Sequence, residues 1–199
     1  MARKVNHTER RQEVALKALH LFSKVGYENV TLIMVAEATG ISRTVLYRYF
    51  DSKRDVMDAA IATVLDEIRV ASERIVRARA SALAKVERIC HVVADVMFAR
   101  REFVIAIFDF VLGRVRTGAD VSERIRMCTS GTRRVLVRLV EQVRRNGHLA
   151  DTLLPDRIVD AIYAEFESCA LRIALNAERD SAAAKVRLSN VVRAISVWR

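Results

Sequence analysis

The chain has 199 residues, a formal net charge of +10 and hydrophobic residues at 52% of its positions. This length and apolar content allow a buried core and exclude an intrinsically disordered protein. One proline and six glycines are too few turn formers for a β-sandwich or barrel, so the composition predicts an all-α protein. The basic excess, which is spread along the chain, favours a polyanionic partner.

The cysteines, histidines and apolar runs argue against disulfide bonds, metal sites and membrane-spanning segments. Cys90, Cys128 and Cys169 lie far apart in apolar helical patterns, and the histidines add no paired ligand spacing. We therefore expect core thiols, no metal, no cofactor and no catalytic residues. No apolar run reaches about 18 residues and no apolar leader follows Met1, which predicts a soluble, cytoplasmic protein without membrane contact.

Apolar residues recur at helical spacing along nearly the whole chain, and glycines separate the periodic segments. Gly131 lies inside one segment and indicates a kink or a break there. The chain divides most naturally after three short helices, into residues 1–52 and 53–199. The pattern predicts helices at about 8–25, 32–39, 43–50, 53–79, 82–99, 101–112, 119–146, 156–177 and 181–198.

The second and third predicted helices have the pattern of a helix-turn-helix. Thr31 and Ser42 are suitable N-caps, because each hydroxyl can accept an unpaired N–H of the first turn. Gly40 can adopt the left-handed conformation that ends a helix, and Ile41 supplies the apolar contact that often follows. Residues 1–52 are therefore predicted to form a three-helix helix-turn-helix domain.

The third predicted helix separates its side chains into two faces. Leu46 and Phe50 form an inward stripe, with Val35 and Ala36 as partners. The outward face carries groups that can reach base edges and phosphates in a major groove. A solvated face is the alternative, but exposed tyrosines give a short polar helix little structural benefit. The outward residues are Arg43, Thr44, Tyr47 and Arg48.

Ser52 and Asp55 have the spacing of a capping box at the start of the fourth predicted helix. Lys53 then lies at a helix N-terminus, where free N–H groups and the helix dipole favour an anion. A DNA phosphate is the obvious candidate.

Residues 31–53, TLIMVAEATGISRTVLYRYFDSK, together with Phe22, Gly26 and Tyr27, resemble the DNA-binding segment of the TetR family of bacterial transcriptional regulators. The resemblance implies a homodimeric repressor whose paired recognition helices enter successive major grooves of a near-palindromic operator. Positions matching Thr31, Tyr47 and Lys53 usually hold phosphates, and those matching Arg43, Thr44 and Arg48 approach bases. Val45 and Ile33 depart from the family pattern, and Tyr49 replaces a frequent histidine. The predicted DNA-binding residues are Thr31, Ser42, Arg43, Thr44, Tyr47, Arg48, Tyr49 and Lys53.

The last two predicted helices have apolar arcs wider than packing on one neighbour requires. A four-helix bundle across a dimer axis would bury both arcs, and the alternative is packing within one subunit. In the eighth helix the arc combines one stripe, Ile158, Ile162, Phe166, Cys169 and Ile173, with a second, Val159, Tyr163, Ala170 and Ala174. The last helix offers Leu188, Val191, Val192, Ile195 and Trp198.

In the TetR family the middle helices bind a small molecule, and the fourth helix moves as a lever between two states. Four of the seven phenylalanines lie within residues 97–110, as a broad apolar cavity would need, although a plain core explains them equally well. For Asp95 and Asp109, a solvated face or an ion pair with nearby arginines is favoured over a role in orienting a polar or cationic ligand. We expect a small, mostly apolar effector and predict His91, Met97, Phe98, Phe103, Ile107, Phe108 and Phe110 as its ligand-binding residues.

The sequence therefore favours a ligand-responsive repressor with an N-terminal helix-turn-helix domain and a helical effector-binding and dimerisation domain. A DNA-binding architectural or interaction protein without an effector is the alternative. A helical enzyme would need a nucleophile, base or metal cluster at usable spacing, and the sequence offers none.

Overall fold

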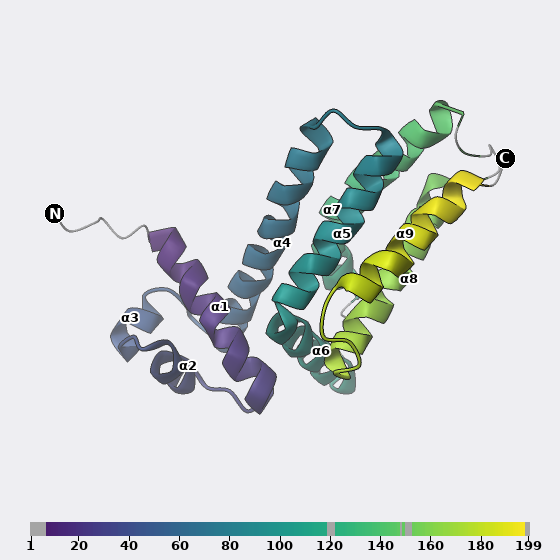
Figure 1. Ribbon diagram of the computed structural model, residues 1–199. Helices are drawn as coiled ribbons and strands as arrows, with labels where there is room; N and C mark the ends of the chain where they lie inside the picture. Colours follow the sequence, from purple (N-terminus) through teal and green to yellow (C-terminus); the bar gives the residue numbers. More distant parts are fainter. Residues whose placement is uncertain (1–6, 119–121, 148, 150–152, 198–199) are drawn as a thin grey trace. The chain divides into compact units, whose positions relative to one another are not determined.

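The computed structural model describes residues 7–118, 122–147, 149 and 153–197, with the backbone alone at 122–128 and 195–197. These residues form helices and no strand, so the predicted all-α fold is confirmed (Figure 1). The helices are α1 (His7–Val25), α2 (Leu32–Thr39), α3 (Arg43–Tyr47), α4 (Lys53–Arg77), α5 (Ala82–Ala99), α6 (Arg101–Arg116), α7 (Ser122–Arg145), α8 (Pro155–Ala174) and α9 (Ala182–Val197).

Three predicted helix ends differ from the structure by three residues or more. α3 ends at Tyr47 instead of Phe50, α8 ends at Ala174 instead of residue 177, and α6 continues past Gly113 to Arg116. A single glycine lowers helix stability by only about 1 kcal/mol, which the flanking turns of α6 tolerate. α7 likewise runs through Gly131 without a break. The glycines with positive φ instead lie beyond helix ends, at Gly26, Gly40, Gly118 and Gly147.

The chain forms two compact units that do not follow one cut in the sequence. The first consists of residues 1–66 and 102–121, and the second of residues 67–101 and 122–199. α6 therefore belongs with α1–α3, and α4 contributes to both units. The boundary after residue 52 remains a prediction about functional domains.

The first unit encloses the predicted inward stripe of the helix-turn-helix. Leu46 and Phe50 are 0% and 1% exposed, and Val35 and Ala36 are buried with them. Phe22 of α1 is buried in the same unit. The residues predicted to face inward in this segment are therefore buried, as expected.

In the second unit α5, α7, α8 and α9 pack against one another (Figure 1). The first predicted stripe of α8 is buried along its whole length, as are Leu188 and Val192 of α9. Burial raises the pKa of the Cys90 thiol to about 12 and that of Cys169 to about 11, so both are protonated core thiols. The side chains of Cys128, Ile195 and Trp198 lie outside the described part of the chain.

Candidate nucleic-acid interface

The ends of α2 and α3 have the local geometry that the sequence predicts. Thr31 Oγ1 accepts the Met34 N–H at 3.3 Å, and Ser42 Oγ accepts the Val45 N–H at 3.3 Å. Gly40 has φ 70° and ψ 29°, and the next N–H, of Ile41, donates to the Ala36 carbonyl at 3.1 Å. Both N-caps and the left-handed C-cap are confirmed. Together they fix the turn between the helices from within the segment.

The predicted outward face of α3 is exposed. Arg43, Thr44, Tyr47 and Arg48 are all accessible, and Tyr47 is 55% exposed. Arg43 makes one long ion pair, 4.0 Å from Glu37, among the interactions found in the described residues. This face therefore presents two guanidiniums, a hydroxyl and a phenol to solvent, groups that hydrogen-bond to base edges and phosphates.

After Tyr47 the chain leaves the helix without exposing its apolar side. The Tyr49 and Phe50 N–H groups both donate to the Leu46 carbonyl, at 2.9 and 3.0 Å. Phe50 therefore stays buried although α3 ends before it. Tyr49 is half-buried, with its ring centroid 4.5 Å from that of His7 at the start of α1.

Arg11 of α1 holds the end of this segment, a role that sequence reasoning missed. Its Nη2 lies 2.6 Å from Asp55 Oδ1, its Nε donates to the Tyr49 carbonyl at 3.2 Å, and its guanidinium lies 4.8 Å from the Phe50 ring centroid. No local pattern could have indicated this residue, because its partners lie 38 or more positions along the chain.

The predicted capping box at α4 is half formed. Ser52 Oγ accepts the Asp55 N–H at 3.2 Å, but the Asp55 carboxylate accepts from the Asp51 N–H at 3.3 Å and from Arg11. Asp55 therefore links α4 to α1 instead of closing back on Ser52.

The Lys53 side chain is engaged within the first unit. Its Nζ donates to the Tyr27 and Glu28 carbonyls at 3.0 and 2.7 Å, and lies 3.5 Å from the Glu28 carboxylate and 4.7 Å from the Tyr27 ring centroid. Its side chain is only 27% exposed. The ammonium thus ties the start of α4 to the loop between α1 and α2.

The same loop is held by α6. Asp109 Oδ2 accepts the Tyr27 N–H at 2.6 Å, and the Phe110 ring meets the Tyr27 ring edge-on at 4.7 Å between centroids. Gly26 has φ +84°, and a Cβ there would lie 3.4 Å from Asp109 Oδ2. Among the described residues Asp109 accepts this main-chain hydrogen bond and makes no ion pair, and its alternative role in orienting a ligand stays a prediction.

The predicted effector residues are divided between the two units. Those on α5 belong to the second unit, where the His91 ring lies 2.9 Å from Ser189 Oγ of α9. Those on α6 belong to the first unit, and Phe110 packs on Tyr27. His91, Met97, Phe103, Ile107 and Phe108 are half-buried, whereas Phe98 and Phe110 are buried. Their role in binding an effector stays a prediction.

Asp95, also considered for ligand binding, forms an ion pair on the surface of the second unit. Its Oδ1 lies 2.5 Å from Lys185 Nζ and accepts from Ser181 Oγ at 2.6 Å. Although burial opposes its ionisation, these two hydrogen bonds hold the pKa of Asp95 below its ordinary value. The sequence favoured an ion pair here, but with arginine instead of lysine.

Within the part of the chain that the structure describes, no three His, Cys, Asp or Glu side chains gather as a metal ion would need. No helix there is long and apolar enough to cross a bilayer.

Two short capped helices, a left-handed glycine between them and an exposed cationic face on the second define a helix-turn-helix protein. Residues 16–60 match the family described as bacterial regulatory proteins, tetR family. The helix-turn-helix segment is thus that of the TetR family of bacterial transcriptional regulators, a DNA-binding type.

Two curated relatives and one solved structure extend this comparison. The regulator HbdR of Aromatoleum sp. (strain CIB) is 28% identical over 62% of this chain and 59% of its own length. The nucleoid occlusion factor SlmA of Mannheimia succiniciproducens is 32% identical over 47% of this chain and 43% of its own length. The chain thus matches about half the length of these relatives. The fold is also similar to that of FadR from Bacillus subtilis, which was solved in complex with stearoyl-CoA. The TM-score is 0.73 at 14% identity, over 93% of this chain and 97% of the other.

Proposed function

We propose that the protein is a cytoplasmic transcriptional repressor, without enzymatic activity, that binds a near-palindromic operator as a homodimer and is released by a small, mostly apolar effector. The observation that carries this proposal is the division of α3. Leu46 anchors the helix at 0% exposure, while Arg43 and Tyr47 on the other side face solvent. A short helix anchored in this way can enter a major groove with its polar side against the bases.

In this proposal the exposed residues have two roles. Arg43, Thr44 and Arg48 read base edges, and Thr31, Ser42, Tyr47, Tyr49 and Lys53 hold phosphates on either side. Since the Lys53 ammonium is bound to the loop after α1, its phosphate contact is made by the main-chain N–H at the start of α4.

Exposed apolar side chains on the last two helices support a homodimer. Leu171 of α8 is 50% exposed, Leu175 directly after α8 is 69% exposed, and Val186 of α9 is 61% exposed. A second copy of the same surface would remove them from water, as in an isologous interface. We propose that α8 and α9 pair in this way.

The proposed effector is mostly apolar because aromatic and aliphatic residues dominate the set predicted on α5 and α6. FadR of Bacillus subtilis, which shares this fold, was solved with stearoyl-CoA, a molecule with a long apolar chain. An effector can release DNA only by binding more tightly to the state with low operator affinity.

Selection from random duplexes at about 150 mM salt tests DNA reading directly. The parent protein is expected to enrich one near-palindromic sequence. Arg43→Gln is expected to relax the preference at one position in each half-site by about 1–3 kcal/mol. Arg88→Gln, which removes the same charge from an exposed position on α5, should select the parent sequence. Equal competition by all duplexes would refute the proposal.

A DNA-organising protein without an effector is the second candidate, favoured by the 32% identity to the nucleoid occlusion factor SlmA. A small-molecule panel screened by thermal shift and by release of the selected operator separates the two. Compounds that raise the melting temperature and release DNA support a repressor. A protein that selects one duplex and keeps it with every stabilising compound supports the second candidate.

A further inference from the structure

An acidic side chain lies beside the exposed face of α3. Glu37 of α2 has its Oε1 atom 4.0 Å from Nη2 of Arg43, the first residue of α3. Both side chains face solvent, at 70% and 63% exposure. A carboxylate in this place repels the phosphates of any duplex that approaches Arg43, so it lowers DNA affinity unless it serves the reading of bases.

The turn between α2 and α3 keeps the two residues close. Gly40 adopts φ 70° and ψ 29°, and its N–H donates to the Glu37 carbonyl at 3.3 Å. The next N–H, of Ile41, donates to the Ala36 carbonyl at 3.1 Å. These bonds fix where the Glu37 and Arg43 side chains leave the backbone, so their charged ends remain within reach of each other although neither is buried.

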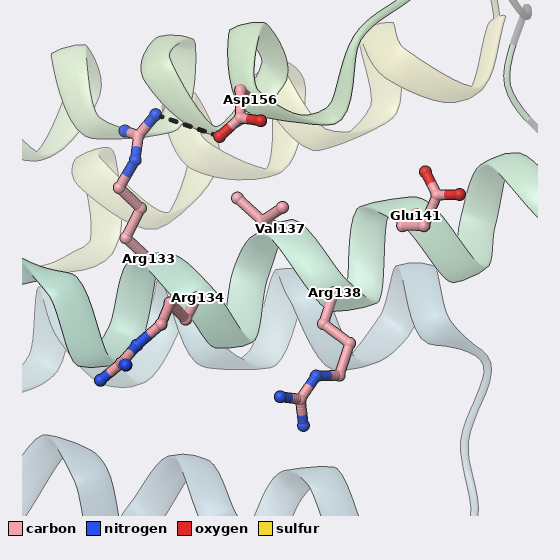
Figure 2. A pocket seen from close by; sticks show the side chains of 6 residues that line it. All are labelled: Arg133, Arg134, Val137, Arg138, Glu141 and Asp156. Carbon is pink, nitrogen blue, oxygen red and sulfur yellow. Dashed lines mark ion pairs between the residues drawn. The ribbon is translucent and has the colours of Figure 1, made fainter.

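The contact with Glu37 does not use up the hydrogen-bond donors of Arg43. Arg133 of α7, which lines a groove between α7 and the start of α8, shows the contrast (Figure 2). Its Nη2 lies 2.7 Å from Asp160 Oδ1 and 3.6 Å from Asp156 Oδ1, and its side chain is 33% exposed. At 4.0 Å the Glu37 carboxylate forms no hydrogen bond with Arg43, so it orients the guanidinium by charge and occupies none of its donors.

Guanine is the base that fits an arginine oriented in this way. It presents two acceptors, O6 and N7, along one edge in the major groove, and a guanidinium can donate to both at once. A carboxylate beside the guanidinium supports this contact, because it can accept from the remaining N–H groups and so fix the plane of the group. A phosphate is disfavoured as the partner of Arg43, since it would place a second anion next to Glu37.

We propose that Glu37 is a positioning residue that orients Arg43 toward a guanine in each half-site of the operator and opposes its contact with phosphates. The inference rests on the proposed function, since it names the base that Arg43 reads and the residue that sets this choice. Glu37 thus lowers affinity for DNA in general and widens the difference between the operator and other duplexes, as repulsive groups do in specific interfaces.

Binding of Glu37→Gln to the selected operator and to a scrambled duplex, at several salt concentrations, tests this role. The parent should prefer guanine by roughly 5–150-fold at the position that depends on Arg43. Glu37→Gln should lower this preference by about threefold or more and tighten binding to the scrambled duplex by a similar factor. Its salt slope on the scrambled duplex should steepen by about one, because Arg43 gains a phosphate contact.

Two further variants separate this role from net charge. Glu9→Gln removes the same charge from an exposed position on α1, in the same unit, and should keep the guanine preference and the salt slope of the parent. In an Arg43→Gln background, Glu37→Gln should change neither quantity, because Glu37 acts through Arg43. The melting temperature of Glu37→Gln should equal that of the parent, since an exposed ion pair adds little stability.

An unchanged guanine preference in Glu37→Gln, an equal effect of Glu9→Gln, or the same effect in the Arg43→Gln background would overturn the assignment. A base other than guanine at the position that depends on Arg43, or a lower melting temperature of Glu37→Gln, would overturn it too. A parent protein that selects no duplex would refute the repressor and this role with it. A parent that selects an operator while Glu37→Gln reads it equally well would refute the role of Glu37 alone.

Discussion

The hydrogen-bond partners that cap the helix-turn-helix lie close together in the sequence, whereas partners in the bundle of α5, α7, α8 and α9 lie far apart. In the first, Thr31 bonds to Met34 and Ser42 to Val45, each three residues away. In the second, His91 bonds to Ser189 across 98 positions, and Arg133 to Asp160 across 27. The caps and the turn of the first region are specified by local chemistry, although Arg11 holds its end across 38 positions, whereas these contacts of the second depend on which helices become neighbours.

The loop between α1 and α2 combines both kinds of contact. It begins at Gly26, whose positive φ a local pattern indicates, but its Tyr27 N–H is bound by Asp109, 82 positions away. Lys53 holds the same loop from the start of α4. A segment that looks like a simple connection is therefore fixed between two helices of the first unit, and changes in α6 reach it directly.

Removal of the Phe50 side chain should have the largest effect. Phe50 is 1% exposed, and Phe50→Ala is expected to destabilise the first unit by about 3–5 kcal/mol because it leaves a cavity under the recognition helix. Hydrogen exchange followed by mass spectrometry should show lost protection in α1–α3, and operator binding should fall with it.

Phe166→Ala in α8 is the matched control, since Phe166 is 7% exposed in the other unit. It should lower protection in α8 and α9 while leaving α1–α3 protected. If Phe50→Ala lowers protection in α8 and α9 as much as in α1–α3, the two units open together, and the stability of the helix-turn-helix is not independent of the bundle.

A smaller effect is expected at the tertiary contact of the loop. Asp109→Ala leaves the Tyr27 N–H without its acceptor at 2.6 Å and should destabilise the first unit by about 1–2 kcal/mol, since water reaches the exposed site. The Tyr27 amide should exchange faster. Asp109→Asn keeps an acceptor oxygen and should lose less than half as much. Unchanged exchange at Tyr27 in Asp109→Ala would mean that α6 does not hold the loop.

Sequence reasoning succeeded where a side chain acts on its own segment. The caps at Thr31 and Ser42 and the left-handed Gly40 follow from rules about neighbouring residues. The roles of Lys53 and Asp109 could not be predicted, because their partners lie on elements whose packing no local pattern specifies. The end of α3 at Tyr47 was missed because the inward stripe continues to Phe50 through a turn instead of a helix.

Substitutions at two glycines are expected to have the smallest effects, and they test whether the local backbone conformation decides the stability of the turn. Gly40 has φ +70° with open space around it, so Gly40→Ala should destabilise the protein by about 1–2 kcal/mol through backbone strain alone. Gly131 lies inside α7, also in open space, and Gly131→Ala should stabilise it by about 0.5–1 kcal/mol.

Denaturant midpoints of the two variants should therefore move in opposite directions, and Gly40→Asn should lie closer to the parent because asparagine tolerates the left-handed conformation. A shift of Gly40→Ala and Gly131→Ala in the same direction would contradict the local account of the turn. The strain at Gly40 would then be too small to fix the angle between α2 and α3, and the position of the recognition helix would depend on Leu46 and Phe50 alone.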